Sequence, residues 1–131
     1  MADVAFEAEG KTLEEMFTGA ALALEEVQVD LNTVTPTIQR EIAVEAQTIE
    51  KLLFDFLDEL IYLKDAEQLL LNQFTMKITQ EGVWKLHCTA GGEVISQQKH
   101  KLGQDVKAVT LHQFKVEQTK EGWNARVVLD I

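Results

Sequence analysis

Acidic groups stand close to both ends of this 131-residue chain. Asp3 precedes a short alternating segment, and Asp130 is followed only by Ile131. Because the last segment alternates as an ordered strand does, it would hold the carboxylate of Ile131 in place. Asp3, Asp130 and Ile131 would then offer oxygen ligands of the kind that calcium or magnesium prefers. Such a site requires the first and last strands to be neighbours; the alternative is a set of ordinary solvated carboxylates.

A second candidate group lies over residues 106–117, which alternate as a strand does. Thr110 and His112 are two positions apart and would share one face of that strand. Such a pair can belong to a ligand site, although it is more often a hydrogen-bonded pair within a sheet. Asp55 and Glu59 are four residues apart on a predicted helix and share a face. That spacing is more typical of a solvated surface.

The sequence gives little evidence for a zinc site, a phosphate-binding loop or a catalytic nucleophile. A single cysteine, Cys88, and three histidines show none of the paired spacings of a closed zinc site. Gly91-Gly92 lies between predicted strands rather than before a helix, which disfavours a phosphate-binding loop. The sequence also has no motif of a nucleophilic enzyme. We therefore propose no catalytic residue.

Charge and composition restrict the partners and the location. The 12 basic and 22 acidic residues give a net charge of −10, which argues against direct binding to nucleic acid. No apolar run approaches the roughly 18 residues of a membrane span, and the first residues lack the features of a secretory signal. One cysteine is compatible with a reducing compartment. We expect a cytoplasmic globular protein.

Periodicity predicts two helices and seven strands. Thr12 and Thr48 are the expected N-caps, for a helix ending near Asp30 and a helix of about sixteen residues. Strands are expected over 4–9, 38–46, 73–80, 84–90, 94–101, 106–117 and 123–131, with turns at Glu81-Gly82, Gly91-Gly92 and Glu121-Gly122. The order β-α-β-α-β-β-β-β-β indicates an α+β fold. Its simplest form is one domain over 1–131, with two helices packed on one face of a mainly antiparallel sheet.

Several blocks, in their order and spacing, resemble the archease family. They are 2–4, 10–17, 20–23, 52–63 with Asp55 and Glu59, His100 with 105–112, and 129–131. The resemblance covers nearly the whole chain. Ala2-Asp3-Val4 resembles the end of the family's opening His-Thr-Ala-Asp motif, but the His-Thr is not present in this sequence.

The resemblance implies a specific function. Archeases are non-enzymatic cofactors of the GTP-dependent RNA ligase that joins 2′,3′-cyclic phosphate and 5′-hydroxyl ends in tRNA splicing and RNA repair. They promote guanylylation of the ligase and its multiple turnover. The resemblance also implies a divalent cation, calcium in the family, bound through Asp3, Asp130 and Ile131. Lys107, Thr110 and His112 match family residues expected near that site or facing the partner.

Two other classes of function remain open from the sequence. The same carboxylates could serve a small metal-dependent enzyme, although no general base pair or substrate motif accompanies them. The chain could also be a chaperone-like adaptor that binds proteins or RNA through its sheet, although the net charge of −10 argues against free RNA as its ligand. Turnover by the isolated protein would favour the enzyme, and binding to unfolded clients would favour the adaptor.

Overall fold

A computed structural model describes residues 3–131 of the chain. Ala2, in the block that resembles the archease opening motif, lies outside the described residues. The elements are β1 (Asp3–Gly10), α1 (Leu13–Gln28), the 3-10 helix η1 (Leu31–Thr33), β2 (Ile38–Ala46), α2 (Ile49–Glu67), β3 (Leu69–Glu81), β4 (Val83–Val94), β5 (Ala108–Val109), β6 (Lys115–Thr119) and β7 (Gly122–Asp130). The predicted order of element types, β-α-β-α followed by five strands, is confirmed, although two of the predicted strands differ from those observed.

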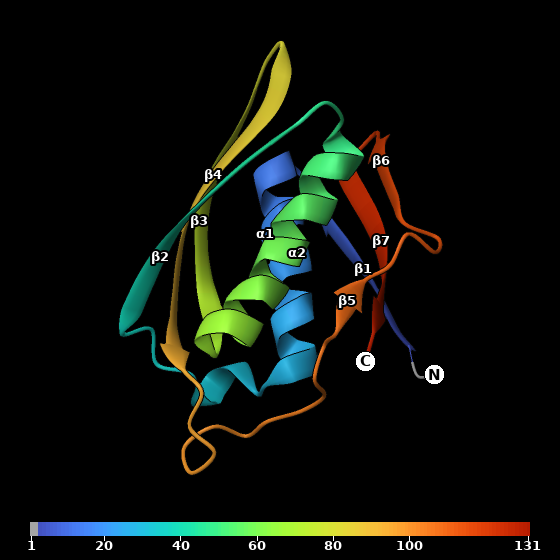
Figure 1. Ribbon diagram of the computed structural model, residues 1–131. Coiled ribbons are helices and arrows are strands. Elements are labelled where there is room, and N and C mark those ends of the chain that lie inside the picture. Colours follow the sequence, from blue (N-terminus) through green and yellow to red (C-terminus); the bar gives the residue numbers. More distant parts are fainter. Residues whose placement is uncertain (1–2) are drawn as a thin grey trace.

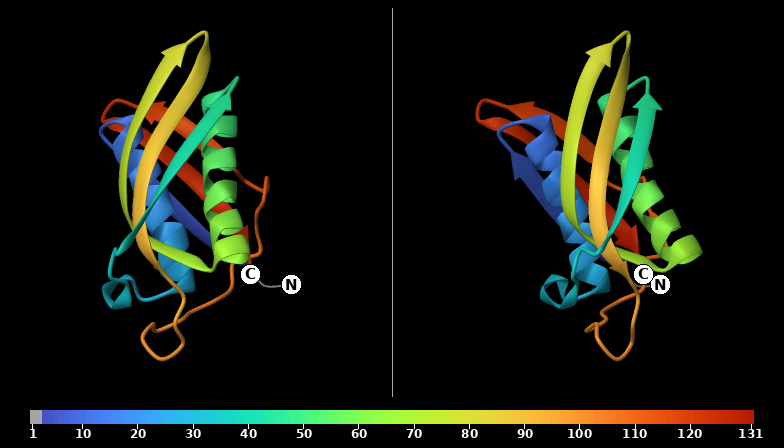
Figure 2. Two further views of the ribbon diagram at one scale, coloured as in Figure 1. Left: turned by 60° about the vertical axis from the view of Figure 1, so that its left-hand side comes forward. Right: turned by 90° about the vertical axis from the view of Figure 1, so that its left-hand side faces the viewer.

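Two antiparallel sheets enclose the pair of helices (Figure 1). In one sheet β7 pairs with β1, β5 and β6, and in the other β4 lies between β2 and β3. In the right-hand view of Figure 2 the β2–β4–β3 sheet faces the viewer and the helices lie behind it. The α+β class is confirmed. The strands differ from the simplest arrangement expected, because they form two sheets instead of one.

Both helices are too apolar for a single sheet to cover. Adjacent positions of a helix point about 100° apart, yet Ala20 and Ala21 of α1, and Leu52 and Leu53 of α2, are all 0% exposed. Burying such a wide face requires cover from two sides. Accordingly α1 packs against β1 and β3, which belong to different sheets, and α2 packs against β2 and β5. No helix within residues 3–131 is long and apolar enough to cross a membrane.

The predicted helix starts are confirmed by their caps. The hydroxyl of Thr12 accepts a hydrogen bond from the N–H of Glu15 at 3.1 Å. The Glu15 carboxylate reaches back to the N–H of Lys11 at 2.7 Å. Thr48 caps α2 in the same way, accepting from the N–H of Lys51 at 3.2 Å. These local contacts satisfy N–H groups that the first helical turn leaves without partners.

β3 begins at Leu69, four residues before the predicted start. Leu69, Leu70 and Leu71 are all nearly fully buried, so the segment lacks the alternation by which a half-exposed strand is recognised. Leu69 and Leu71 face the main core, whereas Leu70 packs in a second cluster with Val29 and Val34. The predicted start of β3 is too late because this part of the strand is buried on both faces.

The predicted hairpin turn at Gly91-Gly92 is wrong, and so is the strand over 94–101. β4 continues through both glycines to Val94 and is followed by a loop. A Cβ atom at Gly92 would lie 1.9 Å from the carbonyl oxygen of Leu70, so glycine is needed there for the close approach of β3 and β4. The turns at Gly82 and Gly122, by contrast, are confirmed, with φ of 78° and 145°.

The predicted strand over 106–117 is divided into β5 and β6. The chain leaves the sheet after Val109 and turns so that the N–H of Phe114 donates to the carbonyl of Leu111 at 3.2 Å. Gln113 has a left-handed backbone with φ of 53°. Its side-chain oxygen accepts from two nitrogens of Arg126 on β7, at 3.1 and 3.0 Å. These contacts stabilise the turn that interrupts the alternation.

Candidate metal centre at the ends of the first and last strands

The first and last strands are direct neighbours, as the proposed metal site requires. β1 pairs antiparallel with β7 over its full length, and Asp3 lies opposite Asp130 in the register. The start of β1 and the end of β7 lie at the same end of the molecule (Figure 1). Directly opposed residues of antiparallel strands project from the same face with Cβ atoms about 5 Å apart. The structure therefore brings together the two aspartates that stand 127 residues apart in the sequence.

The electrostatics of this pair suit a bound cation. Like charges directly opposite each other on neighbouring strands destabilise a sheet. In addition, the Oδ1 atom of Asp130 is buried and has no hydrogen-bond partner among residues 3–131. A buried carboxylate oxygen normally has a donor or a metal ion beside it. Asp3 is exposed and Ile131 is half-buried, so the site faces solvent on one side.

The two aspartates need a further ligand. Among the described residues, no three side chains of histidine, cysteine, aspartate or glutamate lie close enough to hold a metal together. The main-chain carboxylate of Ile131, next to Asp130, is the additional oxygen group that the sequence suggests. A set of hard oxygen donors fits calcium or magnesium and does not fit zinc.

The main chain at Asp130 is held by the segment that enters β5. The N–H of Lys107 donates to the carbonyl oxygen of Asp130 at 2.8 Å, and Ala108 pairs with Asp130 on the side away from β1. Thr110 follows β5 and donates twice to the carbonyl of Val128, from its N–H and its hydroxyl, both at 3.0 Å. Lys107 and Thr110 therefore lie beside the end of β7.

His112 does not share a strand with Thr110. β5 ends at Val109, and His112 is an exposed residue of the turn that follows. The expected pairing of Thr110 and His112 on one strand face is thus wrong, because the strand does not extend to either residue. Sequence alternation alone does not reveal the turn.

Asp55 and Glu59 belong to α2, which begins at the end of the molecule opposite the start of β1 and the end of β7 (Figure 1). Asp55 accepts from the ammonium of Lys51 at 2.6 Å, one turn earlier on the helix. Burial, together with the neighbouring Asp58 and Glu67, raises the pKa of Glu59. Asp55 and Glu59 are both partly exposed, as the expected solvated helix face requires, and Asp55 pairs with Lys51 there.

Buried polar groups that the sequence analysis did not single out lie at the same end of the molecule as the two aspartates. Glu25 on α1 is fully buried, and burial raises its pKa to about 8. Lys64 on α2 is 7% exposed and donates to Asp105 and to the carbonyl of Val106. Ionisable residues inside an apolar helical stripe were the available signal, since such residues are rarely buried without a partner.

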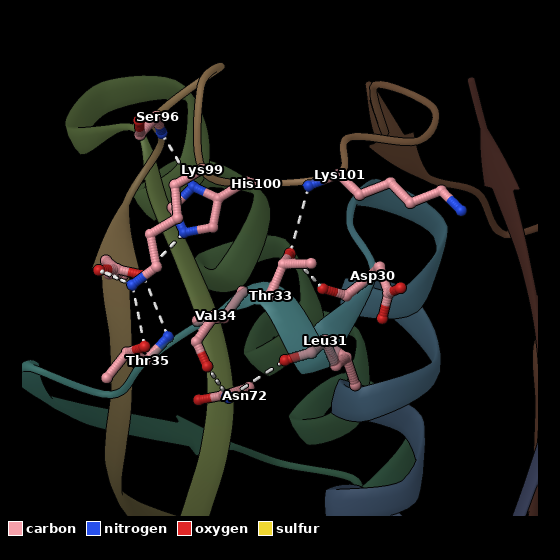
Figure 3. Close-up of polar contacts among 11 residues, drawn as sticks. Asp30, Leu31, Thr33, Val34, Thr35, Asn72, Ser96, Lys99, His100 and Lys101 are labelled. Atoms are coloured by element: carbon pink, nitrogen blue, oxygen red, sulfur yellow. Dashed lines mark hydrogen bonds and ion pairs between the residues drawn. The ribbon is translucent and has the colours of Figure 1, made fainter.

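His100 forms the centre of another network (Figure 3). Its side chain is fully buried, its Nδ1 accepts from the N–H of Ser96 at 2.9 Å, and its Nε2 lies 2.7 Å from Glu93. Because Nδ1 accepts a main-chain N–H, the proton of the neutral ring is on Nε2, which donates to Glu93. Lys99, Thr35 and His100 hold the pKa of Glu93 at about 2. Each nitrogen of the ring thus has a partner.

Comparison with known proteins defines the family. The two-sheet α+β chain matches the family described as Archease protein family (MTH1598/TM1083) over residues 1–131. The chain belongs to the archease family. It is 40% identical over 132 residues to the protein archease of Pyrococcus furiosus, covering 99% of this chain and 93% of that one. It is 36% identical to the protein archease of Methanosarcina acetivorans, covering 99% of this chain and 90% of that one.

Solved structures agree on the fold. The solution structure of Methanobacterium thermoautotrophicum protein 1598 has a TM-score of 0.88 and 37% identity, covering 100% of this chain and 94% of that one. A crystal structure from Thermotoga maritima, described as an archease and possible chaperone, has a TM-score of 0.66 and 22% identity. That alignment covers 99% of this chain and 91% of the other, and at this identity it supports the fold alone.

Proposed function

We propose that this protein is a non-enzymatic cofactor, in the cytoplasm, of the GTP-dependent RNA ligase that joins 2′,3′-cyclic phosphate and 5′-hydroxyl ends in tRNA splicing and RNA repair. It promotes guanylylation of the ligase and repeated turnover. Membership of the archease family supports the class of function. The observation that carries the proposal for the site is the opposed pair of Asp3 and Asp130 with its unpartnered, buried Oδ1 atom.

The acidic tip, formed by Asp3, Asp130 and Ile131, would hold a divalent cation, with calcium as the first candidate. Bound there, the cation would neutralise the repulsion between the two carboxylates. Beside a nucleotide, a divalent cation bridges phosphates and neutralises charge that develops during transfer. The residues of this chain supply the binding and the position, and Lys107 and Thr110 hold the end of β7 on which Asp130 stands.

The charge of the chain suits a protein partner with a basic surface. A net charge of −10 favours association with the surface of a ligase that binds RNA and nucleotide, and it disfavours direct contact with RNA. Association driven by charge accelerates encounter and weakens as salt is added. Stimulation of the ligase by this protein should therefore decrease at high ionic strength.

The test is joining of RNA by the cognate ligase, with GTP and a divalent metal, under single- and multiple-turnover conditions. The expected result is that the protein converts one round of joining into repeated turnover. Asp130→Ala and Asp3→Ala should abolish this stimulation, whereas Glu9→Gln, on the same exposed face of β1, should not. Stimulation that survives both tip substitutions would refute the role of the tip. No stimulation by the wild-type protein of an active ligase would refute the function itself.

The alternatives have distinct signatures in the same experiment. A metal-dependent enzyme would turn over a nucleotide or a cyclic phosphate without the ligase. A chaperone-like adaptor would bind unfolded proteins and would do so at high salt. The Thermotoga maritima protein carries the description of possible chaperone, and no contact within residues 3–131 specifically favours that activity here.

A further inference from the structure

One peptide group connects α2 to the acidic tip. The ammonium of Lys64, near the end of α2, donates to the carbonyl oxygen of Val106 at 2.7 Å. The N–H of the same peptide group belongs to Lys107, and it donates to the carbonyl oxygen of Asp130 at 2.8 Å. The C=O and N–H of a trans peptide point in opposite directions. The peptide therefore bridges Lys64 on one side and the main chain of Asp130 on the other.

The ammonium of Lys64 is held firmly in this arrangement. Besides Val106, it contacts the carboxylates of Asp105 and of Asp65, the latter at 2.8 Å. Burial opposes the charge of Lys64, but the hydrogen bonds with Asp105 and Asp65 outweigh it and raise the pKa. The ammonium has three protons and three acceptors, so its orientation is determined. A charged donor also polarises the peptide, which strengthens the hydrogen bond that the N–H of Lys107 makes.

We propose that Lys64 is a positioning residue for the acidic tip: through the Val106–Lys107 peptide it fixes the main chain at Asp130, and so the separation of Asp130 from Asp3. This inference rests on the proposed function, in which the tip binds a divalent cation. Ligand oxygens of a cation site must be held within a few tenths of an ångström. Groups that orient the ligands typically change the affinity of a metal site by about 10- to 100-fold.

The competing explanation is that Lys64 only stabilises the fold. If Lys64 is only structural, its substitution lowers the free energy of unfolding but leaves the calcium affinity of the folded protein unchanged. If Lys64 is a positioning residue, its substitution also raises the dissociation constant for calcium and accelerates hydrogen exchange at the amide of Lys107. Lys64→Met retains the aliphatic length and removes the ammonium. Lys51→Met is the matched control, because Lys51 also pairs with an aspartate on α2 but is exposed and belongs to the start of the helix, at the end of the molecule opposite the tip.

The measurements are calorimetric titration with calcium and amide exchange by NMR, on folded protein at 25 °C. Lys64→Met should raise the dissociation constant about 10-fold, with faster exchange at Lys107, and Lys51→Met should change neither. If Lys64→Met does not fold, Asp105→Asn is the second test of the positioning role. Asp105 is 69% exposed, so this variant should remain folded. That variant should shift both readouts in the same direction but less, by about 2-fold in affinity, because one of the contacts of the ammonium is weakened.

The outcomes separate this inference from the proposed function. Calcium binding that Asp130→Asn abolishes and Lys64→Met leaves unchanged would overturn the role of Lys64 and retain the site. In the fallback case, unchanged affinity and exchange in Asp105→Asn would overturn it too. Absence of calcium binding by the wild-type protein would overturn both the site and the positioning role.

Discussion

Two carboxylates at strand ends differ sharply in how their oxygens are satisfied. Glu93, near the end of β4, accepts from the N–H of Thr35 at 3.0 Å and from the ammonium of Lys99 at 2.7 Å, and it contacts His100. Asp130, at the end of β7, has a buried oxygen with no partner among residues 3–131. A saturated carboxylate fastens the loop it contacts. An unsaturated one at the protein surface is available to a ligand.

Glu25 lies between these extremes. One of its oxygens accepts from the N–H of Leu71 at 3.1 Å, while Oε2 is buried without a partner among the described residues. Glu25 is 0% exposed, whereas Asp130 is half-buried at the end of the central strand of its sheet. Burial in the core raises the pKa of Glu25 to about 8, so the carboxyl group binds a proton below that pH. A carboxylate oxygen without a hydrogen-bond partner therefore leads to protonation in the core, whereas near the surface it leaves room for a ligand.

The largest expected effect is at the acidic tip. Asp130→Asn should weaken calcium binding by more than about 100-fold, because one charged ligand is lost. The free energy of unfolding without metal should stay the same or rise by a few tenths of a kcal/mol, since the repulsion with Asp3 is relieved. Calorimetric titration and urea unfolding measure the two quantities. A large loss of stability with unchanged affinity would show that Asp130 is a structural residue like Glu93.

The His100 network should show the opposite behaviour. His100→Ala should lower the free energy of unfolding by about 2–3 kcal/mol, because it opens a cavity and leaves the Ser96 N–H without its acceptor. Calcium affinity of the folded protein should be unchanged. His112→Ala is the control, since His112 is exposed and its removal should cost less than about 0.5 kcal/mol. Equal effects in urea unfolding would contradict the structural role of His100.

Glu25 should make stability depend on pH. With a pKa of about 8 in the fold and an ordinary value of 4.5, the folded state binds more protons than the unfolded state between these values. The free energy of unfolding should therefore fall as pH rises from 4.5 to 8, by up to about 1.4 kcal/mol per pH unit. Glu25→Gln should remove this slope, and Glu26→Gln, at an exposed position, should retain it. Urea unfolding at pH 5, 6, 7 and 8 is the measurement. If the free energy of unfolding of the wild type and of Glu25→Gln changed with pH in parallel, Glu25 would not be protonated in the fold.

The smallest effect is expected at Thr110. Thr110→Val removes the hydroxyl that donates to Val128 but retains the main-chain N–H that donates to the same carbonyl. We expect a loss of about 1 kcal/mol or less in the free energy of unfolding and a change in calcium affinity below about 2-fold. A loss of affinity comparable to that of Asp130→Asn would instead make the Thr110 hydroxyl part of the site.

Much of the fold could be predicted because local contacts determine it. The caps at Thr12 and Thr48, the glycine turns and the apolar stripes of both helices involve residues within about four positions of each other. Errors arose where a distant segment changes the meaning of a local pattern. Gly91-Gly92 has the composition of a turn, but the carbonyl of Leu70 makes it part of a strand.

The sequence by itself determined the family, the α+β class, the order of the elements and the two aspartates of the candidate site. Each follows from residue types and their spacing along the chain. Only the tertiary structure decided that two sheets enclose the helices, that Asp3 faces Asp130 and that one oxygen of Asp130 lacks a partner. It also decided that Lys64 reaches a peptide 42 residues away. Such contacts depend on how distant segments pack, and no local periodicity encodes them.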